Sequence, residues 1–293
     1  MTSNHGRPLL PRISGDGSFS LYSPEFAEGF HSADGALGEA RRVYVEPAQL
    51  DRFPRKSRLV VVDVGVGTGT NTAALIESIQ KRELMMTWWG LEQDPLPSQL
   101  ALDDPGFQAQ WPQPVLSQLN QLIHGDTLLW GDARQRLADL QRLQAGHCDL
   151  VLLDAFSPRR CPQLWSQEFL RGLASLLTPQ GRLITYCSAA AVRRSLITAG
   201  LRLSAICSPQ GSGRWSAGTV ASPTPLPDVP PLRPLTPMEL EHLNTRAGEP
   251  YKDPGGCGTA EDILAARSLA QQGSRAESTS EWQRRWRLTD GAQ

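Results

Sequence analysis

The segment from Val60 to Asn71 constrains the fold of this chain more than any other. It reads Val-Val-Val-Asp-Val-Gly-Val-Gly-Thr-Gly-Thr-Asn, an apolar β-branched run that ends near an acid and continues into alternate glycines. Such a run predicts a buried strand. The glycines predict a tight loop whose backbone approaches a ligand closely before a helix begins.

The spacing of these glycines narrows the class of ligand. A dinucleotide-binding loop follows the pattern G-x-G-x-x-G, which would require glycine at the position of Thr70. A nicotinamide-dependent dehydrogenase is therefore disfavoured. Alternate glycines are more typical of loops that bind S-adenosylmethionine (SAM), which face a methionine carboxylate and need no room for a pyrophosphate. The alternative is a glycine-rich turn that serves only the packing of the strand against the helix.

Strands and helices are expected to alternate along the central part of the chain. The expected strands are Leu59–Val64, Thr87–Glu92, Thr127–Trp130, Leu150–Asp154, Arg182–Cys187, Arg202–Ile206 and Trp215–Ala221. The expected helices are Asn71–Glu83, Gln163–Leu177 and Ala189–Ala199. This alternation predicts a doubly wound, Rossmann-like α/β sheet. The last two strands are too close for a parallel crossover, so we expect an antiparallel final pair, as in class I SAM-dependent methyltransferases.

Changes in composition divide the chain into segments. In order, we expect a flexible N-terminus (1–15), a small β-rich cap (16–57), the SAM-binding domain (58–221), a proline-rich linker (222–237), a helical extension (238–272) and a disordered polar tail (273–293). The cap is expected to contain short strands at Ser18–Tyr22 and Arg42–Val45. The extension is expected to contain a short helix at Pro237–Arg246 and another from Ala260.

The composition excludes several classes of protein. The 293 residues carry a formal net charge of −1, so a global cationic field for nucleic acid is absent and any contact with RNA must use a local patch. The five cysteines contain no C-x-x-C pair, which argues against a structural zinc site and a disulfide framework. No apolar run reaches the roughly 18–20 residues that span a membrane. The N-terminus has no apolar signal-peptide core, and we expect a cytoplasmic protein.

Four acids fall at the expected carboxyl ends of strands, where ligands bind in sheets of this kind. Asp63, Glu92, Asp132 and Asp154 follow the first four strands in turn. Glu92 could accept both ribose hydroxyls, and Asp132 could accept the 6-amino group of adenine. Their alternatives are a solvated strand end and a turn-forming Gly-Asp pair. Asp63 is expected to brace the glycine loop.

Asp154 is the strongest candidate for the chemistry. In the segment Asp154-Ala-Phe-Ser-Pro158, a carboxylate and Phe156 lie on a proline-stiffened turn beside the expected methyl donor. Such a carboxylate could orient an amine, which must lose a proton before it attacks a methyl group because its pKa is about 10. The aromatic ring could pack against a flat substrate. The alternative is that Asp154 caps the following turn and Phe156 belongs to the core.

Longer motifs resemble a known family, the bacterial MnmC-like methyltransferases that act on the wobble uridine of tRNA. The resemblance covers roughly residues 16–254. Its motifs are Asp16–Ser23, His31–Glu39, the glycine loop, Trp130–Ala133, Asp154–Trp165, Thr185–Arg194, Ala199–Gly200, Gly211–Arg214 and Glu249–Pro254. The family commonly has Asp-Gly-Phe-Ala-Pro where this chain has Ala155 and Ser157, a departure that bears on substrate choice.

The resemblance implies a SAM-dependent tRNA methyltransferase. It would convert 5-aminomethyl(-2-thio)uridine at the wobble position to 5-methylaminomethyl(-2-thio)uridine. The residues that match the family's SAM site are Gly65, Gly67, Gly69, Asn71, Glu92 and Asp132, with Glu39 and Gly35 in a further pocket motif. Asp154 matches the acid that faces the amine. Bifunctional members also carry a FAD-dependent domain, for which this chain shows no second glycine motif, so we expect neither FAD nor a metal ion.

The expected partner is the anticodon stem-loop of tRNA, and the sequence sets no oligomeric state. Arg159 and Arg160 follow the proposed catalytic turn and, with Arg214, could bind phosphate groups. Arg193 and Arg194 could join them or lie solvated on a helix. The alternative functions are methylation of another amine or RNA base, aminopropyl transfer, and SAM binding without catalysis.

Overall fold

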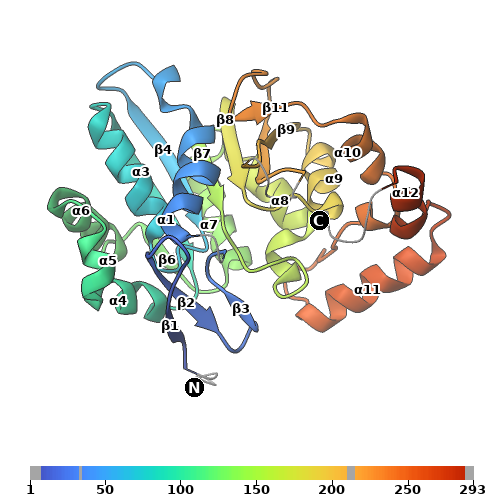
Figure 1. Cartoon of the computed structure of the whole chain (residues 1–293), viewed down its shortest axis with the longest axis horizontal. Coiled ribbons are helices and arrows are strands. Elements are labelled where there is room, and N and C mark those ends of the chain that lie inside the picture. Colours follow the sequence, from blue (N-terminus) through green and yellow to red (C-terminus); the bar gives the residue numbers. More distant parts are fainter. Residues whose placement is uncertain (1–7, 33–34, 210–214, 288–293) are drawn as a thin grey trace. The chain divides into compact units, whose positions relative to one another are not determined.

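The computed structural model of the chain describes residues 8–32, 35–209 and 215–287, which form two compact units. The first unit comprises the residues up to Arg136 and Asp154–Phe156, and the second comprises Leu137–Leu153 and the residues from Ser157 onward (Figure 1). Within the described ranges, no helix is long and apolar enough to cross a membrane. The same ranges contain no group of three or more His, Cys, Asp or Glu residues that could hold a metal ion.

A parallel sheet forms the centre of the first unit. Its strands are β4 (Arg58–Val64), β5 (Met85–Glu92) and β6 (Leu128–Trp130), and β5 pairs in parallel with both neighbours. Successive residues of β4 are buried, as expected for a strand covered on both faces. The three strands confirm the predicted segments to within two residues at each end. Because they are parallel, their carboxyl ends lie at one edge of the sheet.

The helices of the first unit are more numerous than the sequence pattern predicted. They are α1 (Ala36–Glu39), α2 (Glu46–Ala48), α3 (Thr70–Lys81), α4 (Leu96–Asp103), α5 (Pro105–Ala109) and α6 (Gln113–Ile123), with α7 (Ala133–Gln144) continuing into the second unit. Helix α3 confirms the helix expected after the glycine loop. The strand predicted at Arg42–Val45 is wrong, because a π-helix spans Ala40–Val45. Only part of the N-terminal segment is therefore β-rich.

A small antiparallel sheet forms the remainder of the first unit. Its strands are β1 (Leu10–Ile13), β2 (Phe19–Ser23) and β3 (Glu28–Gly29), in the order β1-β2-β3. The strand predicted at Ser18–Tyr22 is confirmed within one residue. The prediction of a flexible segment is wrong for β1, because its backbone pairs with β2.

A mixed sheet forms the centre of the second unit. Its strands are β7 (Cys148–Leu153), β8 (Leu177–Thr185), β9 (Arg202–Ile206), β10 (Gly218–Ser222) and β11 (Leu232–Arg233), in the order β11-β9-β10-β8-β7. Strands β7 and β8 are parallel, and the remaining pairs are antiparallel. The predicted α/β class and antiparallel final pair are thus confirmed. Strand β11 lies inside the segment expected to be a proline-rich linker.

The helices of the second unit extend further toward the C-terminus than the sequence predicted. They are α8 (Gln167–Ala174), α9 (Ala190–Thr198), α10 (Pro237–His242), α11 (Ala260–Gly273) and α12 (Thr279–Arg285). The disordered tail expected from residue 273 is wrong over α12. Ser278 and Glu281 form a capping box at the start of this helix, and Trp282 is fully buried against His242 and Trp215.

Candidate active site

The glycine loop connects the end of β4 to the start of α3. Gly65 and Gly69 have φ angles of 78° and 79°, which are strained for residues that carry a Cβ atom. A Cβ atom on Gly65 would also lie 2.8 Å from the carbonyl oxygen of Asp154. Gly67 faces the ring of Phe30, which a Cβ atom would approach to 3.2 Å. The loop is therefore closely packed, and a side chain at any of these glycines would meet neighbouring protein atoms.

Glu92 lies at the end of β5 and holds the glycine loop. Its Oε2 accepts a hydrogen bond of 2.9 Å from the backbone N–H of Gly67, and its Oε1 accepts from the N–H groups of Gln93 and Asp94. Burial raises the pKa of Glu92 above its usual range, although these hydrogen bonds oppose the rise. The carboxylate thus stands beside the loop, at the sheet edge where we expected it.

Asp132 follows β6 and is paired with an arginine that sequence reasoning missed. Arg134 donates to Oδ2 of Asp132 from Nη2 at 2.7 Å, and its Nε lies 3.1 Å from both carboxylate oxygens. Burial raises the pKa of Asp132, but the hydrogen bonds from Arg134 outweigh it and lower the pKa overall. The backbone links this residue to the site, because Gly131 N–H donates to the carbonyl oxygen of Glu92 at 2.9 Å.

Asp154 lies where the candidate site requires a carboxylate. Its backbone N–H donates to the carbonyl oxygen of Val64 at 2.9 Å, and its Oδ2 accepts a hydrogen bond of 2.6 Å from Nδ2 of Asn71. The structure therefore brings the predicted acid to the first turn of the helix that follows the glycines.

The surroundings of Asp154 favour its protonated form. Burial, together with the nearby charges of Glu39 and Asp63, raises the pKa of this carboxyl to about 8. Hydrogen bonds from Tyr44 and Asn71 oppose this rise. A carboxyl group with such a pKa can both accept and release a proton near neutral pH.

Asp63 lies beneath the loop and is fully buried. Thr72 donates to its Oδ2, and Trp88 Nε1 in turn donates to Thr72 Oγ1 at 3.0 Å. Its Oδ1 has no hydrogen-bond partner among the described residues. Burial raises the pKa of Asp63 to about 7. These contacts tie the end of β4 to α3, consistent with a bracing role.

Two N-terminal motifs join to hold Glu39 in place. Side chains of the loop between β1 and β2 cap the N-terminus of α1, since Ser14 Oγ, Ser18 Oγ and Asp16 Oδ2 accept hydrogen bonds from its first N–H groups. Gly35 precedes the helix, and a Cβ atom there would overlap the side chain of Asp16. Glu39 ends the helix and accepts a hydrogen bond of 2.8 Å from the N–H of Ser32. We refer to this arrangement of residues 14–18 on α1 as the N-terminal clasp.

Phe156 belongs to an aromatic cluster. Its ring stacks on Phe26 with centroids 4.2 Å apart and meets Phe30 edge-on at 5.1 Å. Phe30 in turn faces Gly67 of the loop. The predicted aromatic residue thus lies in a hydrophobic wall next to the glycines, with partners that sequence reasoning did not identify.

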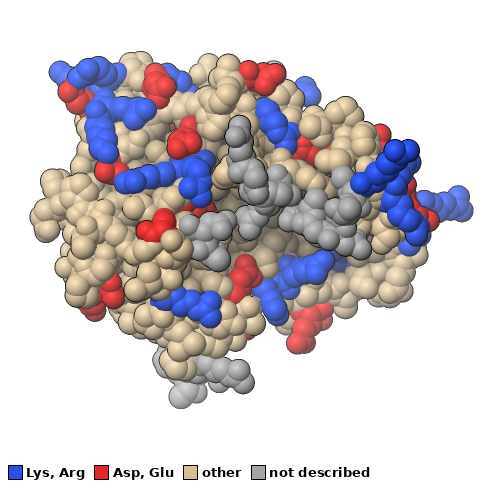
Figure 2. Space-filling view, in the orientation of Figure 1, with Lys and Arg blue, Asp and Glu red and all other residues tan. Residues whose placement is uncertain are grey.

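The arginines expected to bind phosphate have different surroundings. Arg159 and Arg160 are exposed in the second unit, on a turn in which Arg160 N–H donates to the carbonyl oxygen of Ser157 at 2.8 Å. Arg214 lies outside the described residues. Figure 2 shows basic and acidic side chains in small separate groups on the visible face, in keeping with the near-zero net charge. Any contact with phosphate must therefore be local.

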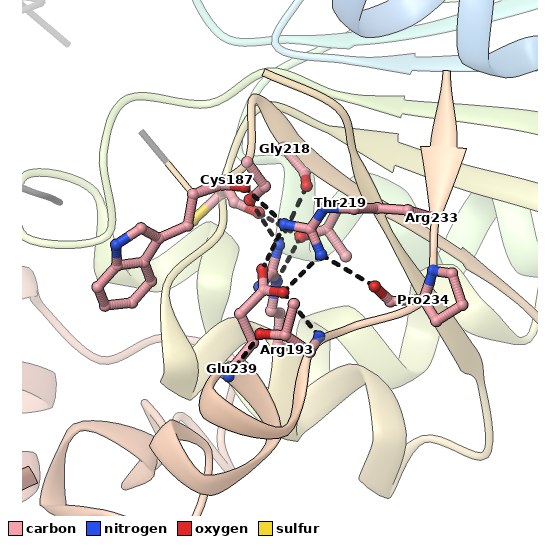
Figure 3. Close-up of polar contacts among 10 residues, drawn as sticks. Cys187, Arg193, Gly218, Thr219, Arg233, Pro234 and Glu239 are labelled. Carbon is pink, nitrogen blue, oxygen red and sulfur yellow. Dashed lines mark hydrogen bonds and ion pairs between the residues drawn. The ribbon is translucent and has the colours of Figure 1, made fainter. Parts of the chain in front are cut away.

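Arg193 is a core residue, so its interpretation as a phosphate contact is wrong. It is 2% exposed and donates to Glu239, Thr219, Ser216 and the carbonyl oxygen of Gly218. Glu239 lies between two guanidinium groups and also pairs with Arg233 at 2.6 Å (Figure 3). All the donor groups of Arg193 are directed inward. The exposed neighbour, Arg194, fits the alternative of a solvated helix face.

Replacement of Gly65 with alanine should weaken SAM binding by at least about tenfold, because the new Cβ would meet the carbonyl oxygen of Asp154 and displace it from the loop. Isothermal titration calorimetry with SAM tests this. Gly146→Ala is a matched control, because Gly146 has a φ of 73° and open space around its Cβ position. Equal SAM affinity in both variants would contradict the close approach at Gly65.

Comparison with known proteins first defines a class. A family model described as S-adenosyl-L-methionine-dependent methyltransferase matches residues 106–223. The solved structure of MnmC2 from Aquifex aeolicus is similar over 92% of this chain and 87% of that chain, with a TM-score of 0.75 and 25% identity. The chain therefore has the class I fold of SAM-dependent methyltransferases.

Individual relatives of this chain indicate a more specific family. The tRNA 5-methylaminomethyl-2-thiouridine biosynthesis bifunctional protein MnmC of Cupriavidus necator is 32% identical over 235 residues, which are 73% of this chain and 34% of that protein. The Aeromonas hydrophila protein of the same name is 28% identical over 86% of this chain and 40% of its own length. The chain thus spans about a third to two fifths of these relatives, and its resemblance to MnmC-like methyltransferases is confirmed.

Proposed function

We propose that this chain transfers a methyl group from SAM to the primary amine of 5-aminomethyl(-2-thio)uridine at the wobble position of tRNA. The product would be 5-methylaminomethyl(-2-thio)uridine. The observation that carries the proposal is the carboxyl group of Asp154, which lies beside the glycine loop with a pKa of about 8. The names of the relatives and the shared motifs support the choice of substrate.

The acid chemistry of the site suits an aliphatic amine. Such an amine has a pKa of about 10 and is protonated at neutral pH, so it must lose a proton before it reacts. Asp154 in its ionised form would hold the ammonium group and accept this proton, and Glu39 would add negative charge on the same side. SAM, when bound, supplies an electrophilic methyl group on a sulfonium sulfur. Alignment of the amine would contribute most of the rate enhancement.

The residues around the loop fit a bound SAM. The backbone of the glycine loop and the buried amide of Asn71 would face its methionine end. Glu92 would accept the ribose hydroxyls, because a carboxylate offers two acceptor oxygens at the end of β5. Asp132 would accept the adenine amino group, for which Arg134 would have to release part of its hydrogen bonding.

The aromatic wall would receive the base. Phe156, which packs against Phe26 and Phe30, provides a flat apolar surface near the glycine loop. A wobble base is unpaired in an anticodon loop and can be held by stacking on such a surface. We place the reaction in the cytoplasm, and we propose SAM as its sole cosubstrate, without FAD or a metal ion.

Arg159 and Arg160 would bind the phosphate groups of the anticodon stem-loop. The double variant Arg159→Ala/Arg160→Ala should bind tRNA more weakly, with a plot of log affinity against log salt that is shallower by roughly 0.7–0.9 per lost phosphate contact. Filter binding across a salt series measures this slope. Arg142→Ala removes an exposed arginine of α7 and serves as the control. An unchanged slope in the double variant would exclude these residues from the RNA contact.

The direct test is product analysis. The purified chain is incubated with SAM and tRNA that bears 5-aminomethyluridine-type wobble bases, and the digested nucleosides are weighed by mass spectrometry. A gain of one methyl group on that base supports the proposal. No gain, with SAM binding intact by calorimetry, would reject the wobble base as substrate and direct the search to other amines or RNA bases.

A further inference from the structure

A buried tyrosine contacts Asp154 from an unusual helical turn. Tyr44 is 1% exposed and forms a side-chain hydrogen bond with the Asp154 carboxyl. It belongs to the π-helix Ala40–Val45, a conformation that is rare in proteins and is frequent at functional sites. The second N-terminal motif of the family resemblance ends at Glu39 and the next begins at the glycine loop, so the motifs leave this tyrosine unassigned.

The π-helical turn explains how Tyr44 and Glu39 can both face Asp154. In an α-helix, two residues five positions apart point about 140° away from each other. In a π-helix the backbone hydrogen bond joins residues i and i+5, so Tyr44 lies roughly one turn beyond Glu39, the residue that precedes this helix. Both side chains act on Asp154, Glu39 through its charge and Tyr44 through its hydroxyl group.

Two sets of contacts hold this turn near its N-terminal end. The N-terminal clasp caps α1, which runs directly into the π-helix. Arg41 within the turn pairs with Glu77 of α3 at 3.1 Å. Tyr44 is therefore oriented before any substrate arrives, which is the condition for a hydrogen bond that positions a reacting group.

We propose that Tyr44 is a positioning residue for the amine-facing carboxylate of Asp154. Its hydroxyl group donates to that carboxylate, while Asn71 Nδ2 donates to Oδ2 at 2.6 Å. Together the two donors define the orientation of the carboxylate and favour its ionised form, which is the form that can take a proton from the amine. This role rests on the proposed function, because it assigns Tyr44 to the same reaction.

The groups that face Asp154 have opposing effects on its protonation. Burial raises its pKa most, and the charges of Glu39 from α1 and Asp63 from β4 also raise it. Tyr44 from the π-helix and Asn71 from α3 lower it by hydrogen bonding. Removal of the Tyr44 hydroxyl should therefore raise the pKa of Asp154 further above about 8.

The variant Tyr44→Phe tests this role and keeps the ring that fills the core. Aspartate carboxyl groups are labelled with ¹³C, the Asp154 resonance is assigned by its loss in Asp154→Asn, and its titration is followed by NMR. We expect the midpoint to rise by about one pH unit, which corresponds to the loss of a hydrogen bond to a charged group. Tyr22→Phe is the control, because the ring of Tyr22 on β2 packs against the guanidinium group of Arg12 on β1.

The pH profile of methyl transfer gives a second measurement. Below the titration midpoint Tyr44→Phe should be about tenfold slower than the wild type, and the two rates should converge at high pH. An unchanged NMR midpoint, or a loss that is the same at every pH, would overturn the proposal. The titration does not require turnover, so a shifted midpoint in a chain that fails to methylate tRNA would reject the proposed substrate and not the role of Tyr44.

Discussion

Replacement of Asp154 with asparagine should abolish methyl transfer while SAM binding remains. The amide has nearly the same shape but cannot accept the proton of an ammonium group. The loss of a positioned acid or base typically lowers the rate by about 10²–10⁴-fold. Nucleoside mass spectrometry measures transfer, and calorimetry measures SAM affinity. Because the ionised carboxyl is the active form, kcat/KM of the wild type should rise with pH and level off above the pKa of Asp154, which is about 8.

A stability measurement guards against a trivial loss of structure. The pKa of Asp154 is raised in the folded chain, so its ionisation costs stability progressively as the pH rises from about 4 through about 8. The uncharged Asp154→Asn variant should therefore melt at a higher temperature than the wild type at pH 8. Asp126→Asn, at an exposed position before β6, is the control. An active Asp154→Asn enzyme would remove Asp154 from the chemistry.

Replacement of Glu239 with alanine should lower the free energy of unfolding by about 3–5 kcal/mol, because it leaves the charge of Arg193 buried without its anionic partner. Glu239 is 1% exposed and pairs with Arg193 at 3.0 Å and Arg233 at 2.6 Å. Urea unfolding of the full chain at pH 7 measures the loss. Asp139→Ala breaks an exposed pair with Arg142 and should cost at most about 1 kcal/mol.

The same ion-pair cluster predicts a dependence on pH. Burial raises the pKa of Glu239, but hydrogen bonds from Arg233, Thr236 and Arg193 outweigh it and lower the pKa to about 2. A lowered carboxyl pKa stabilises the fold above the unfolded value, and this contribution is lost as the pH falls from about 4.5 to about 2. Exposed ion pairs contribute at most about 1 kcal/mol. If the free energy of unfolding of Glu239→Ala lies within about 1 kcal/mol of the wild-type value, the cluster is not a principal support of the second unit.

The strands of the two units could be predicted because their sequences carry their own signal. Strand β9 has the predicted bounds, and β4 and β5 differ from prediction by one or two residues. Helices α4 and α5 could not be predicted in the same way, because both are short and contain proline in the first turn. In the π-helix, β-branched and aromatic residues favour a strand locally, and tertiary contacts override that preference.

Part of the candidate site follows from the sequence and part does not. Glu92, Asp132 and Asp154 could be placed together because parallel strands bring their carboxyl ends to one edge. Tyr44 and Arg134 could not, because their roles depend on which side chain they meet after folding. For α12 a signal was present, since Ser278-x-x-Glu281 is a capping-box pattern before Trp282.

The N-terminal clasp has a consequence for how the active site can open. Helix α1 has four residues and is too short to persist by local propensity. Its stability comes from residues about twenty positions earlier, and the segment that carries Glu39 and Tyr44 depends on it. We therefore expect this half of the site to open locally more readily than the central sheet unfolds. Catalysis can thus be lost by release of one loop, at a free-energy cost well below that of global unfolding.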